Sequence, residues 1–256
     1  MIISVIGDSN PSPELLHIAE EVGAELARHD VTTVCGGGRG VMEAVCRGAK
    51  SNGGTTIGIL PGSDRRNAND WVDVAIPTAM GQARNVLVVK TGEAVIAIGG
   101  RYGTLSEIGH ALKAGIPVVG VRTWSLSKDG KIDPSISTAQ TANEAVEKAI
   151  EDVGSREADK LKRSLRPLSV IATVCPLLGL LGTVYGMINA FGETARSGGT
   201  AKTAQLAEGI YEALVTTATG LTIAIPVLLL YLFLQGRVDK VLDAVDEAGS
   251  DFVFSC

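Results

Sequence analysis

The hydrophobic pattern of the chain changes character near residue 166. Upstream of it, short apolar β-branched runs alternate with segments whose apolar residues recur at helical spacing. Downstream lie two segments without charged side chains, residues 167–192 and 213–236. About 20 such residues are enough to cross a bilayer as a helix. The pattern therefore predicts an α/β domain followed by a two-helix transmembrane hairpin.

The first part of the chain reads as alternating strands and helices. Apolar strands separated by amphipathic helices favour a parallel sheet that is covered on both faces. The expected strands span residues 1–7, 31–35, 55–60, 72–76, 94–98 and 116–121. The expected helices span residues 11–28, 41–51, 81–90, a segment opened by 99–104 that ends at 113, and 142–153.

We expect four parts along the chain. Residues 1–153 form the α/β domain, 154–167 a charged connector, 168–247 the hairpin and 248–256 a tail. The apolar start of the chain is only six residues long and has no basic flank. It therefore reads as a first β-strand and not as a signal peptide.

Basic residues flank the two apolar segments unevenly. The loop between the segments carries Arg196 and Lys202. Because Lys and Arg accumulate in cytoplasmic flanks, the bias predicts that both ends of the hairpin and the first domain face the cytoplasm of a bacterial inner membrane. The basic residues on the predicted cytoplasmic side are Lys160, Lys162, Arg163, Arg166, Arg237 and Lys240.

Composition narrows the function classes. A net charge of −5 and 4% aromatic residues in 256 residues give no case for nucleic-acid binding. The four cysteines show no CxxC spacing and lie in unrelated contexts, so we expect reduced thiols and neither a disulfide framework nor a metal site. They are Cys35, Cys46, Cys175 and Cys256.

Two glycine-rich loops, residues 36–40 and 99–104, each lie between a strand and a helix N-terminus. Unpaired N–H groups and the helix dipole at such a place suit a phosphate, and glycine lets the backbone approach it closely. Ligands of open α/β sheets bind at the carboxyl ends of the strands. The candidate ligand-binding residues are therefore Gly7, Ser9, Gly36, Gly37, Gly38, Gly40, Gly100, Arg101, Gly103 and Thr104.

Three blocks of the first part, CGGGRGVMEAVCRGA, PTAMGQARN and IGGRYGTLSEIGHALK, carry a family resemblance. Over about residues 1–150 the chain resembles the LOG-type branch of the SLOG superfamily, and within it the small proteins related to the molybdenum-cofactor carrier protein. The resemblance implies a Rossmann-like sheet, usually in a dimer, with a pocket for a nucleotide, phosphoribosyl or molybdopterin-type ligand.

Hydrolytic members of this family cleave the N-glycosidic bond of nucleoside 5'-monophosphates. By motif, their catalytic Arg and Glu fall on Arg84 and Glu107. The sequence departs from the hydrolases in two places: Asn85 follows Arg84 where Lys is typical, and Arg101 stands where Gly is usual. Two plainer interpretations stay open, in which Glu107 only complements its helix dipole and Arg84 is a surface residue.

The second part carries a resemblance in PLLGLLGTVYGMINAF and LAEGIYEALVTTATGLTIAIPVLLLY. Over about residues 160–247 the chain resembles the last two helices of the ExbB/TolQ/MotA proton-channel family. That family implies a pentamer around an ExbD/TolR-like partner with an essential Asp, and proton flow that powers transport. The family's first helix and most of its cytoplasmic loop have no counterpart here, and the α/β domain stands in their place.

Family roles carried over by motif place Thr183 and Thr217 along the proton pathway and Glu212 at its mouth. Pro176 and Pro226 would shape the helices. The alternative for each Thr is a bond to its own i−4 carbonyl. Three small residues, Gly179, Gly182 and Gly186, would let the helices pack closely.

Three hypotheses follow for the whole chain. The first is a proton-channel component whose cytosolic domain senses a nucleotide-like ligand. The second is a membrane-tethered phosphoribohydrolase, or a molybdenum-cofactor-carrier-like binder, with an inactive channel segment. The third is a fusion of two unrelated pieces, by gene rearrangement or assembly error, with neither activity intact.

Overall fold

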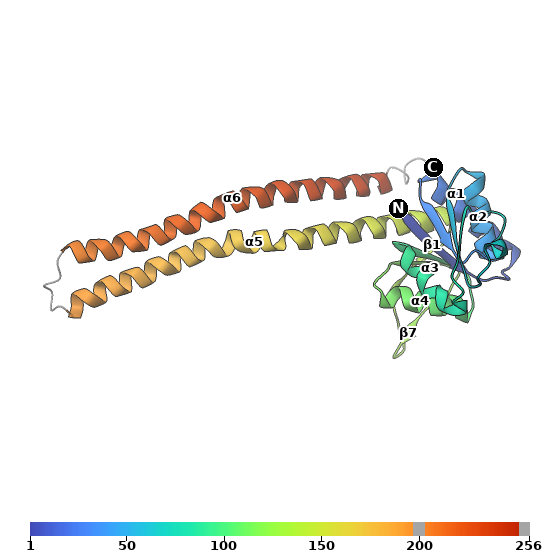
Figure 1. Ribbon diagram of the computed structural model, residues 1–256, viewed down its shortest axis with the longest axis horizontal. Helices are drawn as coiled ribbons and strands as arrows, with labels where there is room; N and C mark the ends of the chain where they lie inside the picture. The colour runs from blue at the N-terminus through green and yellow to red at the C-terminus, as the bar shows by residue number, and fades with distance from the viewer. Residues whose placement is uncertain (197–202, 251–256) are drawn as a thin grey trace. The chain divides into compact units, whose positions relative to one another are not determined.

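The computed structural model describes residues 1–196 and 203–250, with side chains described for 1–196 and 207–240. The described residues form two compact units, Met1–Ser155 and Arg156–Ser250. A single helix, α5 (Ala142–Arg196), begins in the first unit and ends in the second (Figure 1).

The first unit is built on a seven-stranded sheet in the order β4-β3-β2-β1-β5-β6-β9. Every neighbouring pair of strands is parallel, as the alternation of strands and helices predicts. A two-stranded hairpin of β7 (Ser127–Lys128) and β8 (Lys131–Ile132) lies outside this sheet. The strands of the main sheet are β1 (Ile2–Gly7), β2 (Thr32–Cys35), β3 (Thr56–Leu60), β4 (Val74–Pro77), β5 (Ala94–Ile98), β6 (Val118–Val121) and β9 (Ile136–Ala139).

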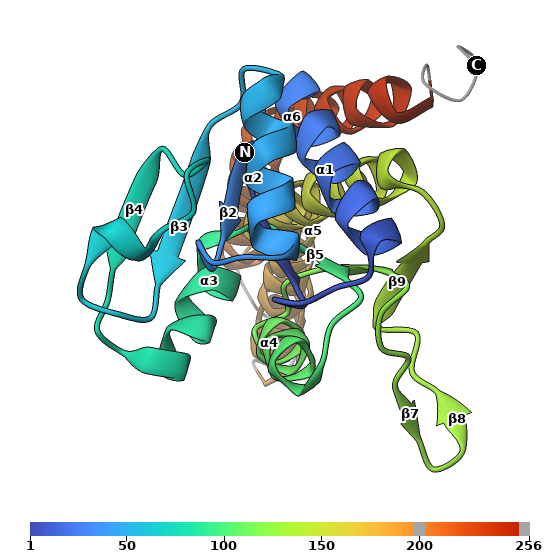
Figure 2. The same ribbon diagram turned by 90° about the vertical axis from the view of Figure 1, so that its right-hand side faces the viewer.

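Helices cover both faces of this sheet (Figure 2). The helices that precede α5 are α1 (Pro13–Arg28), α2 (Val41–Ser51), α3 (Asn85–Thr91) and α4 (Tyr102–Lys113), with the short 3₁₀ helices η1 (Arg65–Asn67) and η2 (Gly81–Arg84).

Strand β1 shows how the two cores arise. Its residues Ile3 and Val5 are buried against α1, α2 and the first turns of α5, whereas Ile6 is buried against α3 and α4. Side chains alternate between the faces of a strand, so a continuous apolar run supplies both cores at once.

Three sequence expectations differ from the structure. The strand at 116–121 is not the last one, because β9 follows it along the chain. The expected helix at 81–90 is divided into η2 and α3. The helix expected to end near Val153 runs on to Arg196. Only one glycine, Gly154, interrupts a stretch rich in helix-forming Lys, Arg, Glu, Ala and Leu, and one glycine costs a helix only about 1 kcal/mol.

The second unit is an antiparallel pair of helices, α5 and α6 (Thr203–Ser250). The prolines of both helices lie inside them without ending them. Small residues line the contact, as expected from the sequence. A Cβ atom on Gly179 would lie 3.0 Å from Cα of Thr217, and one on Gly220 would lie 2.7 Å from the carbonyl oxygen of Cys175.

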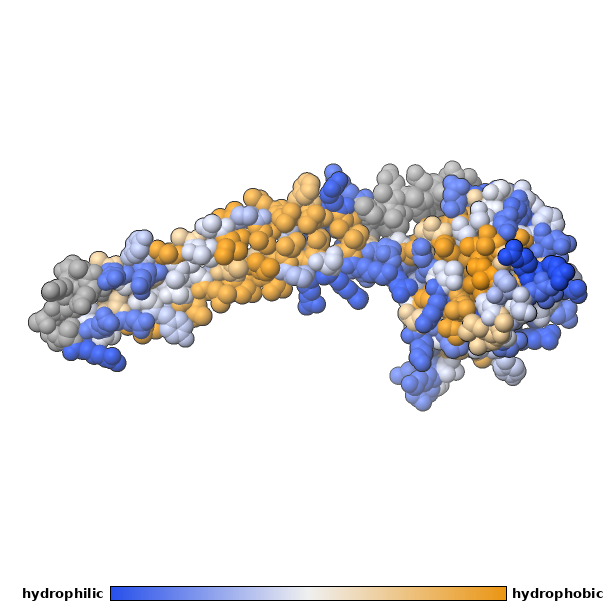
Figure 3. All heavy atoms as spheres, viewed as in Figure 1, coloured by the Kyte–Doolittle hydropathy of each residue, from blue (hydrophilic) through white to orange (hydrophobic). Residues whose placement is uncertain are grey.

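Most of the apolar surface of this helix pair is exposed. Each helix contains an 18-residue apolar window of which only 11% is buried. Figure 3 shows these residues as an apolar band on the two helices, with hydrophilic residues beyond both of its ends. Such a band needs a lipid or protein environment. Of the predicted tail, residues 248–250 continue α6, and residues 251–256, like Lys202 of the loop, lie outside the described residues.

Candidate functional site

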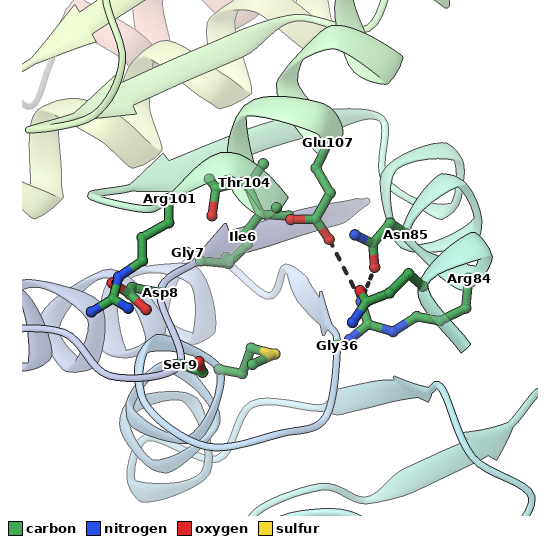
Figure 4. Close-up of a pocket in the computed structure, with 14 residues that line it drawn as sticks. Ile6, Gly7, Asp8, Ser9, Gly36, Arg84, Asn85, Arg101, Thr104 and Glu107 are labelled. Carbon is green, nitrogen blue, oxygen red and sulfur yellow. Dashed lines mark hydrogen bonds and ion pairs between the residues drawn. The ribbon is translucent and has the colours of Figure 1, made fainter. Parts of the chain in front are cut away.

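A pocket of about 300 Å³ lies at the carboxyl end of β1 (Figure 4). Strand β1 stands between β2 and β5, where the order of the sheet reverses direction. Ligands of open α/β sheets bind at this switch point. The walls come from the loops after β1 and β2, from η2 and from the start of α4. The topology alone therefore makes this pocket the candidate ligand site.

Arg84 and Glu107 face each other across this pocket. Nη1 of Arg84 lies 3.5 Å from Oε1 of Glu107, and the side chains are 11% and 9% exposed. The same Nη1 donates a hydrogen bond of 2.9 Å to Oδ1 of Asn85. The interpretation of Arg84 as a surface residue is thus wrong.

Burial raises the pKa of the Glu107 carboxyl to about 7, although the Arg84 guanidinium lowers it. Burial also lowers the pKa of Arg84, against the opposing effects of Glu107 and Cys35. Arginine nevertheless stays protonated at neutral pH. Near pH 7 the pair therefore alternates between an ion pair and a cation beside a neutral acid.

The guanidinium of Arg84 has spare hydrogen-bonding capacity. Its Nε is buried and has no partner among the described residues. A buried guanidinium N–H without an acceptor is costly. Arg84 lines the pocket, so its positive charge favours an anionic ligand there.

Gly36 makes room for this guanidinium. A Cβ atom at Gly36 would lie 2.5 Å from Nη2 of Arg84 and 2.7 Å from Sδ of Met42. The first glycine-rich loop therefore serves the site partly by letting Arg84 lie against its backbone.

Arg101 and Asp8 form a second ion pair at the pocket. Nε of Arg101 lies 2.9 Å from Oδ2 of Asp8, and the Arg101 side chain is 72% exposed. Arg101 also precedes α4, whose first turn has no side-chain cap. The exposed cation and the uncapped helix start both favour a negative group in the pocket.

Most of the residues singled out in the sequence meet at this pocket. Those that line it are Gly7, Ser9, Gly36, Arg84, Arg101, Gly103, Thr104 and Glu107. The other loop glycines do not line it. Gly37, Gly40 and Gly100 have φ angles of 68°, 71° and 105°, and so shape the turns. Gly38 has no such angle.

Sequence reasoning missed several lining residues. Asp8 directly follows β1, and nothing in the sequence pairs it with Arg101. Gln82 and Met42 lie inside the recognised blocks, but no charge or spacing distinguishes them.

The cysteines also differ from expectation. Sγ of Cys35 lies 3.5 Å from Sγ of Cys46, so these two residues do not lie in unrelated contexts. Both are buried and free. The hydrogen bond with Cys35, together with burial, raises the pKa of the Cys46 thiol and so keeps it protonated.

In the second unit, the two candidate pathway threonines behave differently. The hydroxyl of Thr217 donates 3.1 Å to the carbonyl oxygen of Gly179 on the other helix. The hydroxyl of Thr183 donates a hydrogen bond of 2.6 Å to the carbonyl oxygen of Leu180 on its own helix. The alternative is a bond to the i−4 carbonyl of the same helix. It is wrong for Thr217, which bonds to the other helix. Thr183 does bond within its own helix, but to the i−3 carbonyl. Glu212 is exposed on α6.

Comparisons with known proteins agree with this division. Residues 1–154 match the SLOG cluster4 family, and residues 120–247 match the MotA/TolQ/ExbB proton channel family. The chain belongs to both families. Membership of the second family and the two exposed apolar helices place the protein in a membrane.

Each of the individual relatives below matches only part of the chain. An uncharacterized protein from Archaeoglobus fulgidus is 44% identical over 122 residues, which cover 48% of this chain and 80% of that protein. The Tol-Pal system protein TolQ from Haemophilus influenzae is 42% identical over 88 residues, which cover 34% of this chain and 38% of TolQ. The chain spans between 35% and 42% of the length of four curated ExbB and TolQ proteins that it matches.

A solved structure resembles the first unit. The molybdenum cofactor binding protein from the phototrophic bacterium Rippkaea orientalis superposes with a TM-score of 0.52 at 34% sequence identity. The match covers 57% of this chain and 93% of that protein. It bears out the Rossmann-like SLOG fold predicted from the three sequence blocks.

Proposed function

We propose that this protein is a membrane component of an ExbB/TolQ-type proton-driven complex whose first unit senses a phosphate-bearing ligand. The observation that carries the sensing role is Arg84, a buried guanidinium with a donor to spare at the switch point of the sheet. Family membership supports the channel role. Helix α5 supports a link between the two, because its first turns are buried in the core of the first unit and its later turns form a membrane segment.

The ligand is of nucleotide or molybdopterin type. Both carry a phosphate, which Arg84, Arg101 and the uncapped start of α4 would hold. A volume of about 300 Å³ is at the small end for organic ligands, so part of the ligand would project from the pocket. The similar protein from Rippkaea orientalis is a molybdenum cofactor binding protein, which favours the pterin class.

The membrane role adds a location and partners. The basic flanks of the hairpin support an inner membrane location with the first unit in the cytoplasm. Membership of the MotA/TolQ/ExbB family supports a homo-oligomer with an ExbD/TolR-like partner. Thr183, Thr217 and Glu212 are the proposed proton-pathway residues.

One observation favours a second function, hydrolysis of the N-glycosidic bond of a nucleoside monophosphate. With a pKa near 7, Glu107 could exchange a proton at neutral pH, as a general acid or base must. Arg84 would then hold the phosphate. The residues that depart from the hydrolase pattern, Asn85 and Arg101, both line the pocket, so a binding role is the better-supported one.

Calorimetric titration of the full chain in lipid nanodiscs tests the sensing role, with AMP and molybdenum cofactor as separate ligands. We expect saturable binding of at least one of them, weakened about tenfold or more by Arg84→Gln. The exposed Arg28→Gln on α1 is the matched control and should bind like the wild type. Equal affinities in all three proteins would contradict the proposal.

Chromatography of the AMP samples distinguishes binder from hydrolase. Release of adenine that Glu107→Gln abolishes would establish the hydrolase. Binding without release shows that the pocket is a binding site and not a hydrolase.

A further inference from the structure

A groove of about 360 Å³ lies between α5 and α6 in the second unit. It shares no lining residue with the pocket at the carboxyl end of β1 and contains none of the proposed proton-pathway residues. Three cations, one carboxylate and two hydroxyl side chains line it: Lys162, Arg163, Arg166, Asp159, Ser169 and Tyr231.

The spacing of these residues explains why they meet. From Asp159 to Ser169 successive lining residues of α5 are three, one, three and three positions apart, which places them on one face of the helix. Tyr231 comes from the facing helix α6. The groove is therefore a property of the paired helices and not of either helix alone.

The groove lies where the charged and apolar parts of α5 meet. Its cations end at Arg166, and the uncharged segment begins with the next residue. Just beyond, the apolar side chains of Val170 and Leu232 are 52% and 54% exposed. Figure 3 shows hydrophilic residues bordering the apolar band on the two helices. In a bilayer this border falls at the headgroup level, where Tyr, Lys and Arg are enriched.

The positive charge of the groove is incompletely matched. Lys162 has a long ion pair with Asp239, with 3.8 Å between Nζ and Oδ1. No ion pair of Arg163 or Arg166 is found among the described side chains. Three cations face one carboxylate in the lining. An anion would complete this set of charges, and guanidinium groups bind phosphate oxygens especially well.

We propose that this groove binds the headgroup phosphate of an anionic phospholipid. Arg163 and Arg166 hold the phosphate, and the hydroxyls of Ser169 and Tyr231 donate to headgroup oxygens. The acyl chains lie along the exposed apolar side chains beside the groove. Those apolar neighbours favour a lipid over a free phosphate ion, which could not use them.

Native mass spectrometry of the detergent-solubilised full chain tests this site. Phosphatidylglycerol and phosphatidylcholine are titrated in parallel, with and without millimolar inorganic phosphate. We expect the wild type to bind phosphatidylglycerol about tenfold more tightly than phosphatidylcholine. Inorganic phosphate should not displace it. Displacement by inorganic phosphate would overturn the lipid assignment.

Two double variants localise the binding. Arg163→Gln with Arg166→Gln should abolish the preference for phosphatidylglycerol. Arg156→Gln with Lys160→Gln removes the same charge from the same helix outside the groove and should leave the preference intact. An equal loss in both double variants would overturn the proposal, because charge alone would then explain binding.

A milder change guards against misfolding of the arginine variant. Tyr231→Phe removes one hydroxyl from the groove without changing charge, and should weaken phosphatidylglycerol binding two- to fivefold, about the value of one hydrogen bond. Unchanged binding in Tyr231→Phe together with a preference retained in the arginine variant would rule out the groove.

Discussion

Nη1 of Arg84 lies 3.5 Å from Oε1 of Glu107 near the carboxyl end of the central strand, and the two side chains are only 11% and 9% exposed. Two segments that lie more than 20 residues apart in the sequence bring these groups together. Burial raises the pKa of the Glu107 carboxyl, and the guanidinium at 3.5 Å offsets only part of this rise.

Glu107 makes the stability of the first unit depend on pH. Its pKa is about 7 in the folded protein against an ordinary 4.5, so the folded state holds the proton more tightly than the unfolded state. Its contribution to the free energy of unfolding therefore falls as pH rises from about 4.5 to about 7 and is constant above that range. The fall is about 3 kcal/mol, at about 1.4 kcal/mol for each pH unit.

Denaturant unfolding of the full chain, followed by tryptophan fluorescence, measures this effect. Both tryptophans, Trp71 and Trp124, belong to the first unit, so the signal reports its unfolding. The Glu107→Gln variant has no titratable group at this position. The difference in unfolding free energy between wild type and variant should therefore shrink or reverse between pH 5 and pH 8. A difference that does not change with pH would show that Glu107 has an ordinary pKa.

Gly36→Ala should weaken ligand binding without unfolding the protein. The new methyl group would displace the Arg84 guanidinium, 2.5 Å away. Gly36 is not among the glycines with positive φ, so its backbone accepts alanine. We expect about a tenfold loss of affinity for the pocket ligand, measured by calorimetry.

Gly38→Ala is the control for that substitution. It lies in the same loop, and its Cβ atom would meet only the flexible end of Met42, at 3.0 Å. Its ligand affinity should stay within about twofold of the wild type, which is below 0.5 kcal/mol. If both alanine variants lose affinity equally, the loop and not Arg84 determines binding.

Thr217→Val should loosen the helix pair, whereas Thr183→Val should not. The Thr217 hydroxyl joins the two helices through Gly179, but that of Thr183 bonds within its own helix. Such interhelical bonds are worth about 0.6 kcal/mol, and up to about 1.7. Hydrogen exchange of the full chain in nanodiscs should be faster around residues 175–186 only in Thr217→Val. Equal exchange in both variants would leave no structural role for the Thr217 bond.

The sequence predicts the central strands and α2 well because each is an apolar run bounded by glycine or turn residues. Helix α2 spans the predicted 41–51, and β5 the predicted 94–98. Strand β9 was missed because its four residues, ISTA, are too short and too polar to stand out. Its pairing with β6 gives it structure, and no local pattern encodes that pairing.

The site was predictable only in part. Its charged members, Arg84 and Glu107, came from a family resemblance, and the glycine loops from their place after strands. The ion pair of Arg101 with Asp8 and the contact of Cys35 with Cys46 depend on how loops and helices pack. Neither pair has a sequence spacing that would indicate it.

Proton flux into proteoliposomes tests most directly whether ligand binding to the first unit changes proton flow through the second. The full chain would be reconstituted with the proposed ExbD/TolR-like partner and assayed with and without a ligand shown to bind the chain. We predict a flux above that of empty vesicles, changed about fivefold or more by the ligand in the wild type and not in Arg84→Gln. A wild-type flux no greater than that of empty vesicles, or one that a bound ligand leaves unchanged, would contradict the account.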